Sequence, residues 1–142
     1  NDLTSYLARK KFKSYCIFED DFKKLDNDSK LEYKTAITNY KILSNFSLKD
    51  VLSNNQSELT TLTKHFFDKN TIIKNQENIL LLELQPKTGR HHQLRSQMNL
   101  YGGVIVGDFK YGFKDINKNI DLKLFAKQIV FTLNNKKYDI AL

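Results

Sequence analysis

Two short blocks of polar and basic residues have the composition of a functional site. The first is T-G-R-H-H-Q-L-R over residues 88–95, and the second is G-D-F-K-Y-G over residues 107–112. Where a turn leads into a helix, backbone N–H groups and cationic side chains can converge on a phosphate. The first block is therefore expected to contact a phosphate-bearing partner, and ordinary helices and turns do not need its combination of residues.

Both blocks resemble motifs of the RluA family of RNA pseudouridine synthases. That family carries T-G-R-x-H-Q-[IL]-R and then, after a glycine-containing turn, G-D-x-x-Y-G. The fixed positions are filled here by Thr88, Gly89, Arg90, His92, Gln93, Leu94, Arg95, Gly107, Asp108, Tyr111 and Gly112. Weaker matches keep the family's order: K-S-Y at 13–15, K-T-A-I-T at 34–38 and L-K-L-F-A at 122–126. Two multi-residue blocks in the right order are far more specific than a lone T-G-R.

The resemblance implies an enzyme that isomerises uridine to pseudouridine in structured RNA, with no metal and no external cofactor. It also implies a catalytic aspartate, an arginine that pairs with it and a tyrosine near the flipped base. Arg95 matches the arginine, which could hold a carboxylate ionised in a bidentate pair. Tyr15 matches the tyrosine. We expect the two side chains beside one apolar pocket, on the same face of the sheet; the alternatives are a surface arginine that binds phosphate and a tyrosine that packs in the core.

The catalytic aspartate itself has no counterpart in this sequence. In the family it lies in an H-R-L-D-x-x-T-S-G block upstream of the K-x-Y strand, but no histidine occurs here before His65 and Asp2 has no basic or glycine-rich context. Residues 1–142 are therefore expected to be the C-terminal portion of a single catalytic domain. Such a portion needs the N-terminal half of the same protein as its partner and should be inactive alone.

A non-catalytic RNA-binding or ribosome-associated relative of the same fold is the alternative. Phe125 stands where the family has a histidine, which favours that alternative. Arg95 and Tyr15 argue against it, because a decayed site has no reason to keep both. The sequence upstream of Asn1 would discriminate between the two.

The remaining residues of the two blocks suggest supporting roles. Contact with RNA is expected from Lys87, Arg90, His91 and His92. Gln93 should orient neighbouring backbone, and Asp108 should cap or brace a turn. Adjacent histidines are poorly spaced to share a metal on a helix and there is no cysteine partner near them, so no metal site is expected.

Composition agrees with an RNA partner. The net charge is +7 and the sequence pI is about 9.4. Binding to ribosomal or transfer RNA would release counterions from its phosphates, although a general lysine bias could also raise the charge. The single cysteine, Cys16, excludes an internal disulfide. No apolar run approaches the roughly 20 residues needed to cross a bilayer, so a cytoplasmic protein without membrane contact is expected.

Periodicity predicts an α+β fold: a mixed, mainly antiparallel sheet with flanking helices. Strands are expected at 13–18, 35–43, 78–85 and 104–106, followed by a hairpin of 122–133 with 138–142. Residues 1–9 are expected to be the end of a helix. Further helices are expected in an insertion at 46–70 and at 91–101, while 19–30 is expected to be a loop. In the helix at 91–101, Leu94, Met98 and Tyr101 should face inward.

Overall fold

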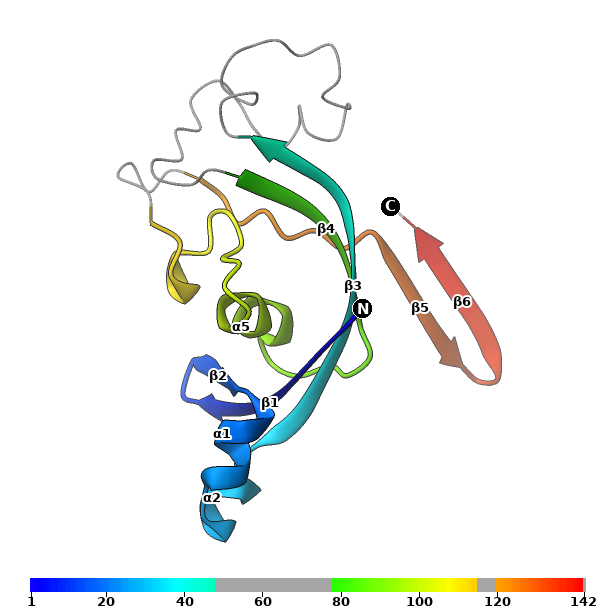
Figure 1. The fold of residues 1–142 in the computed structure, drawn as a ribbon. Helices are drawn as coiled ribbons and strands as arrows, with labels where there is room; N and C mark the ends of the chain where they lie inside the picture. The colour runs from blue at the N-terminus through cyan, green and yellow to red at the C-terminus, as the bar shows by residue number, and fades with distance from the viewer. Residues whose placement is uncertain (48–77, 115–119, 142) are drawn as a thin grey trace.

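A computed structural model describes residues 1–47, 78–114 and 120–141 of the chain (Figure 1). A four-stranded antiparallel sheet curves around helix α5, and a two-stranded hairpin lies apart from it. This arrangement confirms the predicted α+β class with a mainly antiparallel sheet and flanking helices.

The larger sheet has the strand order β2-β1-β3-β4. Its strands are β1 (Asp2–Lys10), β2 (Lys13–Ile17), β3 (Lys34–Ser47) and β4 (Asn78–Pro86). The strands predicted at 13–18, 35–43 and 78–85 are thus present. β4 is a nearly continuous apolar run, which suits the interior of a sheet, but in the described part of the chain it ends the sheet order, and Leu80 is 48% exposed.

The helix expected within residues 1–9 is wrong, because this segment is strand β1. Leu3, Ser5 and Leu7 are buried at every second position, the period of a strand. The spacing of Leu3, Tyr6 and Leu7 also fits a helix, and a short apolar pattern does not distinguish the two. Pairing with β2 on one side and β3 on the other decides the conformation.

The loop expected at 19–30 is also wrong, because the segment contains helices α1 (Glu19–Lys24) and α2 (Asn27–Leu31). Acidic residues open α1 and lysines close it, which suits the helix dipole. Asp26 caps α2 by accepting a hydrogen bond from the Ser29 N–H at 2.8 Å. The Phe22 ring of α1 stacks on Tyr6 of β1, with centroids 3.9 Å apart.

Helix α5 (Gln93–Leu100) lies within the predicted range 91–101 and is followed by Gly102 in the left-handed conformation. The strand expected at 104–106 is absent, and the chain instead turns into the short 3-10 helix η1 (Phe109–Tyr111). Val104 and Val106 pack with Ile120 against the buried Ile79 and Phe113. None of the described helices has the length and apolarity that a membrane span requires.

The C-terminal hairpin consists of β5 (Gln128–Leu133) and β6 (Lys136–Ala141). Asn134 and Asn135 connect them with φ angles of 49° and 61°, the left-handed values that a tight hairpin turn requires. The hairpin is confirmed, although residues 122–127 precede the strand rather than belong to it. In the insertion expected at 46–70, residues 46–47 are the end of β3 and the others lie outside the described residues.

Candidate functional site

The face of α5 that packs on the sheet is mostly polar. Gln93, Ser96 and Gln97 are buried there together with Met98. Of the predicted inward residues only Met98 is fully buried, while Leu94 is partly buried and Tyr101 is 40% exposed. The expected apolar face is wrong because the strands beneath present buried hydroxyl groups from Ser5, Ser14 and Thr38.

Gln97 joins α5 to two strands through four hydrogen bonds. Its amide Nε2 donates to the Leu3 carbonyl at 3.2 Å, the Ser5 Oγ at 3.1 Å and the Ala36 carbonyl at 3.0 Å. Its Oε1 accepts from the Thr38 hydroxyl at 2.6 Å. The Gln97 side chain is completely buried. A satisfied buried network of this kind fixes the helix in one position on the sheet.

Gln93 and Thr88 shape the turn that leads into α5. Gln93 Oε1 accepts from the Thr88 hydroxyl at 2.8 Å and from the Arg90 N–H at 3.0 Å. The Thr88 Oγ1 in turn accepts from the Ile37 N–H at 3.0 Å. Gln93 therefore orients neighbouring backbone, as expected. In this turn His92 adopts the left-handed backbone conformation, with a φ angle of 54°.

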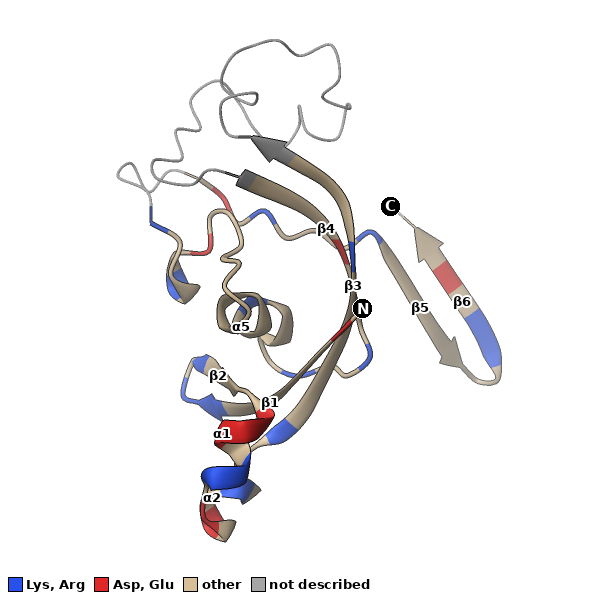
Figure 2. Ribbon diagram, in the orientation of Figure 1, with Lys and Arg blue, Asp and Glu red and all other residues tan. Residues whose placement is uncertain are grey.

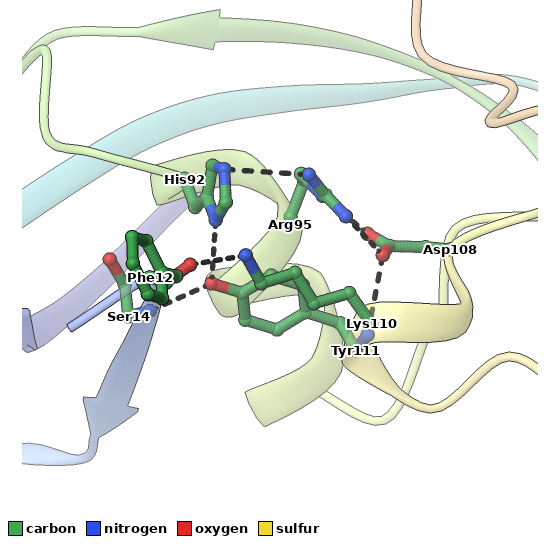
Figure 3. Close-up of polar contacts among 7 residues, drawn as sticks. All are labelled: Phe12, Ser14, His92, Arg95, Asp108, Lys110 and Tyr111. Atoms are coloured by element: carbon green, nitrogen blue, oxygen red, sulfur yellow. Dashed lines mark hydrogen bonds and ion pairs between the residues drawn. The ribbon is translucent and has the colours of Figure 1, made fainter. Parts of the chain in front are cut away.

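Arg95 and Asp108 unite the two sequence blocks in one bidentate ion pair (Figure 3). Arg95 Nε donates to Asp108 Oδ2 at 2.9 Å, and Nη2 donates to Oδ1 at 2.7 Å. The Asp108 side chain is fully buried and that of Arg95 is 20% exposed. The hydrogen bond to Asp108 raises the pKa of Arg95. A carboxylate for Arg95 is thus present within the chain, which the sequence did not indicate.

Asp108 also caps η1, because its side chain accepts from the Tyr111 N–H, as expected. The backbone conformation explains why both ends of the second block are glycines. Gly107 has φ +78° and a Cβ there would overlap the Asp121 backbone, while Gly112 ends η1 with φ +111°. The G-D-x-x-Y-G block is therefore a turn that presents Asp108 to Arg95.

Tyr111 is the aromatic residue next to Arg95. The Arg95 guanidinium lies 5.1 Å from the centre of the Tyr111 ring, within cation–π range. The buried Tyr111 oxygen accepts from the Ser14 N–H on β2 at 2.8 Å and lies 3.1 Å from His92 Nδ1. Figure 3 shows this chain of contacts from Ser14 through Tyr111 and His92 to Arg95.

His92 lies between Arg95 and Tyr111. Its Nε2 is 3.5 Å from Arg95 Nη1, and its Nδ1 is 3.1 Å from the Tyr111 oxygen. Burial first, and then the charges of His91, Arg95 and Lys110, lower the pKa of His92.

Lowering the pH from 7.5 to 5.5 is expected to reduce the free energy of unfolding. Burial and nearby cations lower the pKa values of His91 and His92 from 6.5. As the pH falls, the histidines of the unfolded chain therefore bind protons at a higher pH than those of the folded chain. Their neutral forms stabilise the fold fully above pH 6.5, and this contribution is lost as the pH falls through the pKa values of the folded state. Urea unfolding at both pH values measures the loss. His92→Gln should show a smaller loss, and equal losses would contradict this account.

Tyr15 is connected to the surroundings of Arg95 through Lys13. The Lys13 ammonium lies 5.7 Å from the centre of the Tyr15 ring and 5.0 Å from the centre of the Tyr111 ring, on which the Arg95 guanidinium lies at 5.1 Å. The Tyr15 side chain is open to solvent, since the residue is 46% exposed. The expectation that Tyr15 and Arg95 lie beside one pocket stays a prediction.

The residues expected to bind RNA fall into two groups. Lys87 and Arg90 are exposed on the turn before α5, where Lys87 Nζ donates to Gln85 and Arg90 Nε to the Thr35 carbonyl. His91 and His92 instead lie partly buried, stacked on each other with centroids 3.9 Å apart. Among the residues with described positions, no three His, Cys, Asp or Glu side chains form a group that could hold a metal ion.

Sequence reasoning missed the partners of Arg95. Tyr111 was noted only as a fixed motif position, and nothing marked Ser14, which lies between the motif residues Lys13 and Tyr15. The sequence offered one weak signal, an arginine in one block and an aspartate in the next, but nothing in it showed that the two side chains meet.

Comparison with known proteins supports the resemblance, and the family match covers the first sequence block. Residues 4–100 match the family model described as RNA pseudouridylate synthase. A ribosomal large subunit pseudouridine synthase C of Rickettsia felis is 56% identical over 37% of the chain and 21% of its own length. The Rickettsia typhi protein of the same name is 38% identical over 50% of the chain and 22% of its own length. An RNA pseudouridylate synthase domain-containing protein 1 of Danio rerio is 33% identical over 57% of the chain and 25% of its own length.

The aligned part of the chain thus spans about a fifth to a quarter of the length of these relatives. No solved structure matches the chain.

Proposed function

This chain belongs to the RNA pseudouridylate synthase family, and we propose that the protein to which it contributes converts uridine to pseudouridine in RNA. The observation that carries the proposal is the bidentate contact between Arg95 and Asp108, which unites both family blocks in one partly buried site. Ribosomal RNA is the proposed substrate, by analogy with the names of the Rickettsia relatives. Transfer RNA is the alternative substrate.

Arg95 is proposed to hold the catalytic carboxylate that the rest of the protein supplies. Asp108 occupies Nε and one N–H of Nη2, and a guanidinium has five N–H donors. Its remaining N–H groups can therefore donate to a second carboxylate at the exposed side of Arg95. Residues 1–142 would then be the C-terminal portion of one catalytic domain, completed by the N-terminal half.

The exposure of Tyr15 favours contact with RNA over packing in the core. A half-exposed ring can still stack on a base, and the Lys13 ammonium lies 5.7 Å from its centre. We propose that Tyr15 contacts RNA by stacking.

The test is pseudouridine formation by the full-length protein on ribosomal and transfer RNA labelled with tritium at C5 of uridine. Joining the base through C5 releases that hydrogen, so tritium in water reports turnover. Release from ribosomal RNA supports the proposal. Binding of both RNAs without release would instead favour the non-catalytic RNA-binding relative.

RNA binding by the full-length protein should depend on the turn before α5. Replacing Lys87 and Arg90 by Ala is expected to weaken binding and to reduce the slope of log K against log salt by about 1 for each lost phosphate contact. Fluorescence anisotropy titrations at several KCl concentrations measure this slope. An unchanged slope would mean that the RNA backbone runs elsewhere.

A further inference from the structure

We infer that the tip of the β1–β2 hairpin is a second RNA-contacting surface, which holds unpaired nucleotides beside the target uridine. This basic tip consists of Arg9, Lys10, Lys11, Phe12 and Lys13. The inference rests on the proposed function in taking RNA as the partner. All residues of the tip lie outside both sequence blocks, and Lys13 belongs to the weaker K-S-Y match.

The positive charges of the basic tip are not neutralised by ion pairs. In the described ranges the ion pairs involve Lys23, Lys24, Arg95 and Lys127, and none involves a residue of the tip. Figure 2 shows the contrast, since Lys and Arg colour the β1–β2 hairpin while acidic residues open α1. On α1, Lys23 and Lys24 each pair with a carboxylate, at 2.9 and 3.1 Å.

The fold brings these positive charges close together, which lowers its stability. Lys10 and Lys13 are direct cross-strand partners, and like charges in that position destabilise a sheet. Lys110 adds a further cation from η1 by donating to the Phe12 carbonyl. Arg9 Nε donates to the Lys11 carbonyl at 3.2 Å, which fixes the turn. Repulsion of this kind is relieved when a polyanion binds.

The exposed aromatic ring at the tip specifies the kind of polyanion. Phe12 is 79% exposed, although it is a large apolar side chain. Exposed rings between cations are what proteins use to bind single-stranded nucleic acid, because the bases stack while the cations contact the phosphates. An acidic peptide would satisfy the charges but offers no flat base for the ring.

The basic tip is continuous with the candidate site. Lys13 lies with its ammonium 5.0 Å from the centre of the Tyr111 ring, on which Arg95 also lies. Ser14, the next residue along β2, bonds to both Tyr111 and His91. RNA held at the tip would therefore lie close to the nucleotide at Arg95.

The first test compares two double lysine variants of the full-length protein. Lys10→Ala with Lys11→Ala removes charge from the tip, whereas Lys23→Ala with Lys24→Ala removes the same charge from α1. Anisotropy titrations with a ribosomal RNA stem-loop at several KCl concentrations give the affinity and its salt slope. The tip variant should bind about tenfold more weakly and lose about 1.4 from the slope, at about 0.7 for each contact to single-stranded phosphate. The α1 variant should bind like the wild type.

The second test separates stacking from charge. Phe12→Ala should weaken binding of the stem-loop about fivefold or more without changing the salt slope, and Phe12→Trp should retain the wild-type affinity. The inference would be overturned if the Lys10/Lys11 variant and Phe12→Ala both bound the stem-loop as tightly as the Lys23/Lys24 control. It would also be overturned if the Lys10/Lys11 variant lost binding to a polyglutamate peptide but kept wild-type affinity for RNA.

The same measurements distinguish failure of the proposed enzymatic function from failure of the inference about the basic tip. If the unmodified full-length protein releases no tritium but the tip variants still lose RNA affinity, the basic tip stands and the enzymatic proposal fails. If tritium is released normally and the tip variants bind as the wild type does, the enzymatic proposal stands and the basic tip is overturned.

Discussion

Asp108→Asn in the full-length protein is expected to abolish detectable pseudouridine formation and to reduce the free energy of unfolding by about 3 kcal/mol. The Asp108 carboxylate is fully buried and accepts two hydrogen bonds from Arg95. An amide offers one acceptor and turns its N–H groups toward a guanidinium that only donates. Arg95 would then be left as a poorly compensated charge, free to turn away from the position proposed for catalysis.

The measurements are tritium release and urea unfolding, with Glu83→Gln as the matched control. Glu83 also pairs with a cation, Lys127, but both side chains of that pair are largely open to solvent. Exposed ion pairs contribute little to the free energy of unfolding, so Glu83→Gln should keep wild-type activity and stability. If Asp108→Asn behaved like the control, the ion pair would be neither structural nor catalytic.

A double variant separates the two effects. Asp108→Asn combined with Arg95→Met removes the unpaired charge and should recover part of the lost stability. Activity should stay absent, because Met has no donor for a carboxylate. Recovery of activity in the double variant would exclude Arg95 from the proposed catalytic role.

The two blocks that the sequence analysis singled out lie in contact through Arg95 and Asp108. Gln93 and Asp108 make the backbone hydrogen bonds that their side-chain chemistry predicts. Each of these side chains bonds to backbone only a few residues away, so its role can be inferred from the sequence of its own block. The strands at 13–17 and 78–86 and the turn at Asn134-Asn135 were predictable for the same reason.

The features that could not be predicted from the sequence depend on contacts between distant segments. Arg95 and Asp108 pair because the chain between them turns back, and Ser14 reaches Tyr111 across 97 positions. Strand β1 was mistaken for a helix because its pairing partners lie elsewhere in the chain. The position of Tyr15 beside Arg95 rests on the resemblance alone and stays a prediction.

The polar inner face of α5 is the feature least expected from periodicity, and Gln97→Leu should show how much the fold depends on it. Leucine has a similar size, but it removes the donor to the Leu3 carbonyl, the Ser5 hydroxyl and the Ala36 carbonyl, and the acceptor for Thr38. Each buried polar group left without a partner costs about 1–3 kcal/mol. A total loss of about 3 kcal/mol in the free energy of unfolding is expected.

The matched control is Asn99→Leu, which makes a similar polar-to-apolar change on the exposed side of the same helix. Urea unfolding should show little change for Asn99→Leu and a large loss for Gln97→Leu. Because α5 carries Arg95, the Gln97 variant should also lose pseudouridine formation in the full-length protein at temperatures where it is still folded. Wild-type stability of Gln97→Leu would mean that apolar packing alone can seat this helix, and the buried amide network would then have no role in positioning Arg95.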